Sequence, residues 1–201
     1  MGWLAWLTWE DTMKKLVPVG ISNRHLHLSQ ADIDVLYGTG HQLTNFKDLK
    51  QPGQYACEEK VDLVGPKGVI KGVRVLGPAR KQSQVEVSIT DSFVLGVKPP
   101  VRSSGDLAGS PGVKLVGPKG EVEISEGVIA AERHIHMHTS EAEVFGLKDK
   151  DLVQVKVDGH RGIIFDNVLV RVHPEFALEF HVDVDEGNAA GLQNGQEVEI
   201  L

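Results

Sequence analysis

The chain is poor in cysteine, in aromatic residues and in long apolar runs. Its 201 residues contain one cysteine, Cys57, so no disulfide can form within the chain. A reducing, cytoplasmic compartment is the simplest interpretation, and we expect Cys57 to be a neutral, non-catalytic thiol. We expect no membrane partner, because a spanning helix needs roughly 20 consecutive apolar residues and the apolar runs of this chain are much shorter.

Positive charge is also scarce. Lysine and arginine number 21 against 28 aspartates and glutamates, which gives a formal net charge of −7. This balance argues against a nucleic-acid partner, whose phosphates favour a basic surface. It does not exclude a small anionic substrate, because a few arginines in a cleft can outweigh the mean charge.

All three tryptophans lie near the N-terminus, at Trp3, Trp6 and Trp9. The apolar part of this leader is short and lacks the basic start of a signal peptide. We interpret residues 1–13 as a disordered leader outside the fold. A helix that docks on a partner surface is the alternative.

Short strand patterns dominate the rest of the chain. They are rich in β-branched residues, alternate in polarity and are separated by glycine or proline. Two helices are expected, one from Ser29 to Gly38 and one from Thr139 to Gly146, each with a hydroxyl cap and early carboxylates. This pattern predicts a mostly β protein built as barrels or a sandwich. The predicted strands are 61–64, 69–76, 84–89, 113–116, 122–124, 128–131, 152–157, 168–172 and 198–201.

Part of the sequence occurs twice. Arg24-His-Leu-His and Arg133-His-Ile-His each lead into a predicted helix, and Leu63-Val-Gly-Pro-Lys-Gly recurs from Leu115. Two copies indicate an old duplication rather than a solenoid. We therefore expect two related β units, each with one His-x-His pair.

The two His-x-His pairs are the strongest chemical signal. Side chains at i and i+2 of a strand point to the same face, roughly 6.5–7 Å apart. His25 with His27, and His134 with His136, could therefore each converge on a metal. One pair alone is weak evidence, but two pairs in matching contexts predict a metal site.

Three further residues are candidates for the same site. Glu86 lies between two valines whose side chains must face the other way. His181 follows a short apolar run, and Arg80 could present its planar guanidinium to a phosphate. For each of these three residues, an exposed position on the protein surface is the alternative interpretation. His138 lies close to the second pair, but we expect the helix start to turn its side chain away.

These stretches resemble the PduL-type phosphotransacylases, also called phosphate propanoyltransferases, from about Val17 to the C-terminus. The resemblance rests on five segments, which are 18–28, 77–88, 90–91, 131–137 and 181–190. It implies two β-barrels capped by short helices and intertwined by the internal duplication. Residues 14–23 and 132–201 would form one barrel, 24–37 and 59–131 the other, and 38–58 a lid insertion.

The resemblance also implies a function. It is the reversible transfer of a propanoyl or acetyl group between coenzyme A and inorganic phosphate, by direct attack of phosphate on the thioester. Arg80 corresponds to the phosphate-binding arginine, and Ser22, Gln51 and Phe93 are candidate substrate contacts. Two divalent metals, usually zinc, would be held by His25, His27, Glu86, His134, His136 and His181.

The family also suggests an assembly and a location. The partners are acyl-CoA or CoA and phosphate or acyl phosphate, and a homodimer is expected. Many relatives serve bacterial microcompartments and carry an amphipathic targeting segment, which this leader does not clearly resemble.

Three other functions compete with this interpretation. A two-metal hydrolase would use similar ligands to activate water instead of phosphate. A cupin-like dioxygenase would need a carboxylate a few residues after His27, where Leu28-Ser-Gln-Ala stands. A non-catalytic metal-binding protein is the third, although structural zinc sites are usually rich in cysteine.

Overall fold

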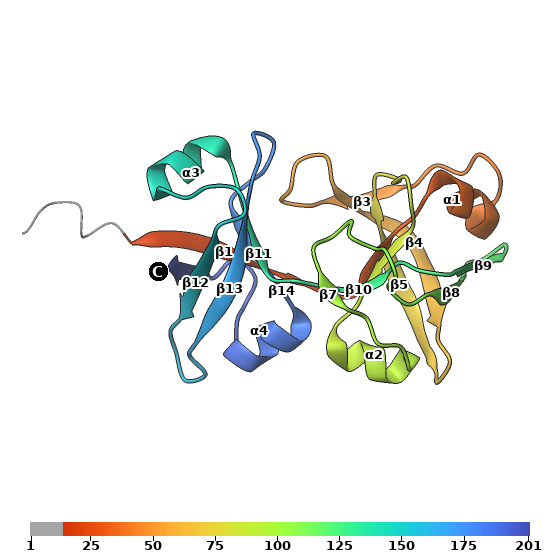
Figure 1. The fold of residues 1–201 in the computed structure, drawn as a ribbon. Coiled ribbons are helices and arrows are strands. Elements are labelled where there is room, and N and C mark those ends of the chain that lie inside the picture. The colour runs from red at the N-terminus through yellow and green to blue at the C-terminus, as the bar shows by residue number, and fades with distance from the viewer. Residues whose placement is uncertain (1–13) are drawn as a thin grey trace, which may run out of the picture.

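Residues 14–201 are described by the computed structural model, so the leader at 1–13 and its interpretation lie outside the described residues. Short strands dominate this part of the chain, and four short helices lie at the upper and lower ends of the sheets in the view of Figure 1. The predicted mostly β fold is confirmed. Two sheets lie side by side, and the polypeptide crosses between them after β1 and after β10.

The first sheet is a closed six-stranded barrel with the strand order β1-β14-β11-β13-β12-β15. β1 comes from the start of the described chain, yet it pairs with the two strands β14 and β15 near the other end. The members of the barrel are β1 (Lys15–Ser22), β11 (His134–Met137), β12 (Leu152–Val157), β13 (Ile163–Val172), β14 (Glu179–Asp183) and β15 (Glu197–Ile200).

The second sheet has nine strands and curls into a half-barrel, whereas the resemblance implied a second barrel. Its order is β7-β10-β6-β2-β5-β4-β8-β9, with β3 paired to β4. The division of the chain into units at the expected boundaries stays a prediction. The strands are β2 (His25–His27), β3 (Asn45–Asp48), β4 (Tyr55–Val64), β5 (Val69–Gly77), β6 (Gln84–Glu86), β7 (Val101–Arg102), β8 (Val113–Val116), β9 (Glu121–Ile124) and β10 (Val128–Ala131).

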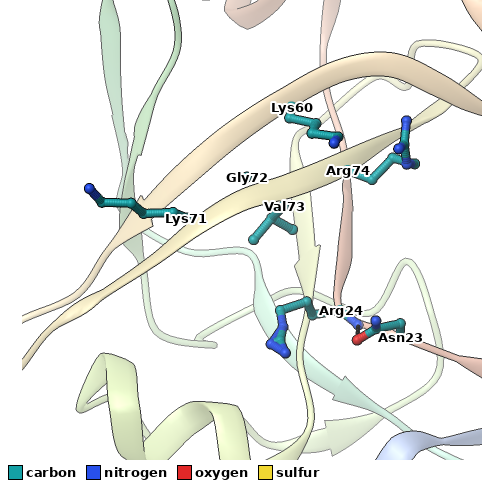
Figure 2. A pocket seen from close by; sticks show the side chains of 7 residues that line it. All are labelled: Asn23, Arg24, Lys60, Lys71, Gly72, Val73 and Arg74. Atoms are coloured by element: carbon teal, nitrogen blue, oxygen red, sulfur yellow. Dashed lines mark hydrogen bonds between the residues drawn. The ribbon is translucent and has the colours of Figure 1, made fainter.

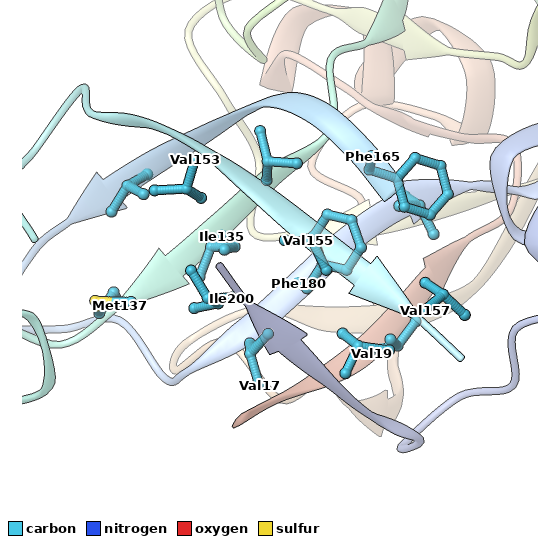
Figure 3. Close-up of a cluster of buried hydrophobic side chains, with 14 of the residues drawn as sticks. Val17, Val19, Ile135, Met137, Val153, Val155, Val157, Phe165, Phe180 and Ile200 are labelled. Atoms are coloured by element: carbon cyan, nitrogen blue, oxygen red, sulfur yellow. The ribbon is translucent and has the colours of Figure 1, made fainter. Parts of the chain in front are cut away.

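The barrel interior is packed with apolar side chains (Figure 3). Ile135, Met137 and Phe180 have no exposed surface and pack with valines from the neighbouring strands. Because side chains alternate along a strand, His134 and His136 must then point out of the barrel. The core thereby decides which face of β11 carries its histidines.

Each of the four helices directly follows a strand that carries at least one candidate metal ligand. α1 (Gln30–Tyr37) and α3 (Thr139–Phe145) lie where the sequence predicts them. α2 (Ile89–Leu95) and α4 (Val184–Ala190) were not predicted, although both begin with a capping box. The predicted strand 84–89 is wrong at its end, because β6 stops at Glu86 and Ser88 caps α2.

No helix in the described part of the chain is long and apolar enough to cross a membrane. Residues 38–58 contain β3 and the beginning of β4. The buried Glu59 holds the start of this segment in place. Its carboxylate accepts hydrogen bonds from the backbone N–H and the hydroxyl of Thr44, and it lies 2.8 Å from His41 Nε2. A lid function for the segment stays a prediction.

Phe180→Ala should test how far the barrel depends on its core. Removing a fully buried phenylalanine leaves a cavity and should lower the free energy of unfolding by roughly 3–5 kcal/mol. Leu152→Ala is the control, because Leu152 is 62% exposed and its loss should change stability by about 0.5 kcal/mol or less. Denaturant unfolding of both variants measures the difference, and equal small losses would contradict the described core.

Candidate active site

A cleft of about 800 Å³ lies between the barrel and the curled sheet. Both His-x-His strands contribute to its lining, since β2 and β11 each begin directly after the chain crosses between the sheets. The duplicated sequence thus places one histidine pair on each side of a single cleft.

The first cluster consists of His25, His27 and Glu86, all of them buried. β2 and β6 are antiparallel, and Glu86 lies directly opposite His25 in their register. His25 Nε2 is 3.4 Å from a Glu86 carboxylate oxygen. One ligand atom from each residue lies within 4.8 Å of the others, so the three can hold a metal ion.

The second cluster is built in the same way from His134, His136 and His181. β11 and β14 are antiparallel, and His181 lies directly opposite His134. The Nε2 atoms of His134 and His136 are 3.0 Å apart, and one ligand atom from each of the three residues lies within 4.8 Å of the others. The second group can therefore also hold a metal ion.

The hydrogen bonds of the ring nitrogens suit metal binding. His25 and His134 each place Nδ1 2.8 Å from the backbone carbonyl two residues earlier, and His27 Nδ1 is 3.2 Å from the Leu76 carbonyl. Such Nδ1–H donation leaves the Nε2 lone pair free for a metal. Within the described residues, the buried Nδ1 of His136 has no hydrogen-bond partner. Five imidazoles and one carboxylate form a donor set that fits divalent metals such as zinc.

Three of the five imidazoles have lowered pKa values, which keeps them neutral: they are those of His27, His134 and His136. Burial, followed by the charge of His25, lowers the pKa of His27 to about 3. Burial and the charge of His181 lower the pKa of His134 to about 4. Burial, His134 and His181 also lower the pKa of His136. Neutral imidazole is the form that binds metals.

Glu86 is held as a carboxylate even though it is buried. Burial opposes its ionisation, but the charge and hydrogen bond of His25 hold its pKa well below the ordinary value. The same attraction outweighs burial for His25, whose pKa is raised. Gln84 Nε2 and Ser104 Oγ both donate to Glu86 Oε1. Glu86 is therefore an internal ligand candidate and not the surface residue that its valine neighbours suggested.

Arg80 lines the same cleft beside the first cluster. Its backbone N–H donates to the Leu28 carbonyl, which fixes it next to the end of β2. The guanidinium Nη1 donates to Ser104 Oγ at 3.2 Å and to Gln84 Oε1 at 3.5 Å. The other guanidinium donors of this half-buried cation have no partner among residues 14–201 and can bind an anion in the cleft.

The other sequence candidates lie in different places. Ser22 and Gln51 line the cleft, and the Gln51 amide is engaged with the backbone of Ala177 across it. Phe93 lies on α2, is 74% exposed and does not line the cleft. His138 caps α3 by accepting from Ser140 N–H, which agrees with its exclusion as a ligand.

Cys57 is fully buried away from the cleft lining, and burial raises its pKa to about 11. It is therefore a protonated thiol at neutral pH, as the sequence analysis expected.

Several cleft residues carried no signal in the sequence. Gln84, Ser104, Arg171 and Phe176 lie in ordinary strand or loop contexts. Only the pairing of distant segments brings them to the histidines. Arg171 alone had a usable clue, since a charged residue interrupts the apolar end of β13.

The arginine before each His-x-His pair has a structural explanation. Arg24 Nη1 donates to Asp91 at 3.1 Å, and Arg133 Nη1 donates to Glu186 at 2.8 Å. Asp91 and Glu186 are the third residues of α2 and α4 and belong to their capping boxes. Both copies of the repeat therefore use the same ion pair to join the histidine strand to the helix that follows the third candidate ligand.

A second, smaller pocket of about 340 Å³ shares Asn23, Arg24 and Arg74 with the cleft lining. Lys60 and Arg74 lie on paired positions of β4 and β5, and Arg24 faces them from the chain before β2 (Figure 2). Lys71 completes a set of four cationic side chains, of which Arg24 is paired with Asp91, and no carboxylate among residues 14–201 lines the pocket itself. This pocket favours an anionic group next to the cleft.

Known proteins resemble the chain over most of its length. A family model described as phosphate propanoyltransferase matches residues 18–193. The phosphate propanoyltransferase of Thermotoga maritima is 59% identical over 184 residues, which cover 91% of this chain and 88% of that protein. The protein of that name from Salmonella typhimurium is 50% identical over 186 residues, covering 92% and 88%. The one from Listeria monocytogenes is 48% identical over 196 residues, covering 96% and 92%.

Proposed function

Because the chain belongs to the phosphate propanoyltransferase family and is an acyltransferase, we propose that it moves a propanoyl or acetyl group reversibly between coenzyme A and inorganic phosphate at a two-metal site. The observation that carries the proposal is the convergence of both metal-competent clusters and Arg80 on one cleft. A metal site without an anion-binding group would suit a hydrolase equally well.

The six candidate ligands and Arg80 have separate tasks in this proposal. Two divalent cations bound by the clusters would act as Lewis acids toward phosphate and thioester oxygens. Arg80 donates paired hydrogen bonds to a phosphate and fixes its orientation toward the thioester carbonyl. Ser104 and Gln84 each form hydrogen bonds with both the Arg80 guanidinium and the Glu86 carboxylate. They therefore fix the position of the proposed phosphate-binding group relative to the first cluster.

We propose direct transfer without a covalent acyl-enzyme. A phosphate oxygen attacks the thioester carbon, the carbon–sulfur bond breaks, and coenzyme A leaves as a thiolate, which needs little help from a general acid. The sole cysteine is buried outside the cleft with a raised pKa, so it is a poor nucleophile. The chain therefore contributes binding and orientation at this step rather than a nucleophile.

The smaller pocket suggests where the nucleotide end of coenzyme A lies. Coenzyme A carries a 3′-phosphate and a diphosphate far from its thiol. The four cations of the smaller pocket can take the phosphates while the thiol end extends into the adjoining cleft. Lys60 and Lys71 are exposed and have no ion pair among residues 14–201, so their charges are free for a ligand.

The central experiment measures the release of CoA thiol from propanoyl-CoA. Release should require phosphate, because phosphate is the acyl acceptor. It should stop when a strong chelator removes the metals and return when zinc or cobalt is added. Equal release with and without phosphate would identify a thioester hydrolase instead, and undiminished release after complete removal of metal would contradict the two-metal site.

Arg80→Ala should separate phosphate binding from metal binding. Losing two charge-assisted hydrogen bonds, each worth roughly 1.5–3 kcal/mol, should slow the reaction by on the order of 10²-fold at low phosphate. Bound metal should stay unchanged, whereas His25→Ala and His134→Ala should each lower it. Arg80→Lys keeps the positive charge but loses the planar pair of N–H donors, so its rate at low phosphate should lie between those of the wild type and Arg80→Ala.

Metal analysis and phosphate titrations of these four variants test the assignment. If Arg80→Ala keeps the wild-type dependence on phosphate, or loses metal as the histidine variants do, the role given to Arg80 is wrong.

The double variant Lys60→Gln/Lys71→Gln should test the nucleotide pocket. Its KM for propanoyl-CoA should rise roughly threefold to tenfold, because exposed ion pairs each contribute about 1 kcal/mol or less. Its KM for propanoyl-3′-dephospho-CoA should stay near the wild-type value if these lysines recognise the 3′-phosphate. Lys148→Gln, an exposed lysine of the barrel unit, is the matched control. An equal rise for both substrates would place the 3′-phosphate elsewhere.

The expectations about assembly, location and substrate contacts stay predictions. They are a homodimer, a place inside a bacterial microcompartment, and contacts of Ser22, Gln51 and Phe93 with substrate. The strong exposure of Phe93 on α2 makes it a better candidate for contact from outside this chain's own cleft than within it.

A further inference from the structure

A second arginine faces the cleft from the barrel. Arg171 lies on β13 directly beside His136, because β11 and β13 are parallel neighbours in that register. Side chains of such neighbours share one face of the sheet, and Arg171 lines the cleft together with Arg80. Arg171 comes from the barrel and Arg80 from the connection between β5 and β6 of the curled sheet, so one arginine lies beside each cluster.

Arg171 has little to balance its charge. Its guanidinium makes no hydrogen bond or ion pair with the protein among residues 14–201, and its one described contact is with the Phe176 ring, whose centroid is 5.7 Å away. The side chain is half-buried. The nearby carboxylate Glu179 already has partners, because it is bonded to His181 and Gln51. A partly desolvated cation without a counter-ion is unfavourable unless a ligand supplies the negative charge.

The positive charge of Arg171 acts on two other residues of the cleft. Its positive charge is among the causes that lower the pKa of Arg80, after burial, and of His136, after burial and two histidines. Two like charges that face one small space repel each other, and an anion between them removes this repulsion. Inorganic phosphate and acyl phosphate both carry such a charge at neutral pH.

We propose that Arg171 is a second phosphate-binding residue, which contacts the phosphate oxygens from the barrel side while Arg80 contacts them from the curled sheet. The inference rests on the proposed function and extends it to a residue outside the recognised motifs. A phosphate held from both sheets is fixed in position and cannot turn its attacking oxygen away from the thioester. Arg171 and Arg80 also neutralise the charge of the acyl phosphate that forms.

A purely structural role is the main competitor. The Arg171 guanidinium lies over Phe176, and the Phe176 ring packs 4.4 Å from the His136 ring, centroid to centroid. In that role Arg171 would only position Phe176 and, through it, the second cluster. Phe176→Leu removes the stacking but leaves the guanidinium, so it separates the two roles.

The test compares Arg171→Gln, Arg171→Lys, Phe176→Leu and the wild-type metal-loaded protein. Arg171→Gln should raise the KM for phosphate roughly 10- to 100-fold, with unchanged metal content and a KM for propanoyl-CoA within about twofold of wild type. Arg171→Lys should have a phosphate KM between those of the wild type and Arg171→Gln, since lysine keeps the positive charge but lacks the planar pair of N–H donors. Lys156→Gln removes one positive charge from β12 outside the cleft lining and should leave the phosphate KM unchanged.

Binding without turnover gives a second readout. Phosphate should raise the thermal midpoint of the metal-loaded wild type, and this rise should shrink strongly in Arg171→Gln but persist in Phe176→Leu. The inference is overturned if Arg171→Gln keeps its phosphate KM within twofold, if the KM for propanoyl-CoA rises instead, or if Phe176→Leu reproduces the whole effect. If the wild type itself shows no phosphate dependence, the proposed function fails first, whatever Arg171 does.

Discussion

Strand register is the constraint on which both clusters depend. His25 meets Glu86, and His134 meets His181, only because the antiparallel pairs align at these positions. A slip of one residue would turn the third member of a cluster toward the core and bring an apolar residue into the cleft. The fully buried Phe180, next to His181, resists this slip because exposing it would forfeit its packing. The apolar cores therefore hold the polar cleft in place.

The duplication explains why the two clusters look alike and where they differ. Each copy contributes a histidine strand, an antiparallel partner with a third candidate ligand, and a capped helix tied back by an arginine. A further bond joins the copies, since Thr90 N–H at the start of α2 donates to Asp185 at the start of α4. The third position holds Glu86 in one copy and His181 in the other. One cluster thus contains a carboxylate and the other only imidazoles, so the two offer different donor sets to a metal.

Much of the site could be predicted from local sequence, because His-x-His spacing and its repetition need no knowledge of the fold. The place of Glu86 could not be decided, since a glutamate between valines is typical of an exposed strand, and its contacts with His25 and Ser104 join segments far apart in the sequence. Arg171 offered only the clue of a charge within an apolar strand end, and its place in the same cleft as Arg80 follows from the way the two sheets face each other. Closure was equally hidden: alternating strands look the same in a barrel and in a half-barrel, because closure depends on which distant edges pair. The helices α2 and α4 escaped for local reasons: the strand pattern of 84–89 runs over Ser88, which caps α2, and Asp183, which caps α4, offers no hydroxyl.

The pairing of β1 with β14 and β15 has a consequence for the synthesis of the protein. The curled sheet draws its strands from residues 25–131 and can assemble as soon as that stretch has left the ribosome. β1 emerges earlier but must wait for β15, the last strand of the chain, before the barrel can close. During this interval its apolar residues and its strand edges are unprotected, which is the state in which nascent chains aggregate or recruit chaperones. Completion of the cleft therefore waits for the synthesis of β15, and translation speed over residues 132–200 sets how long the nascent chain stays vulnerable.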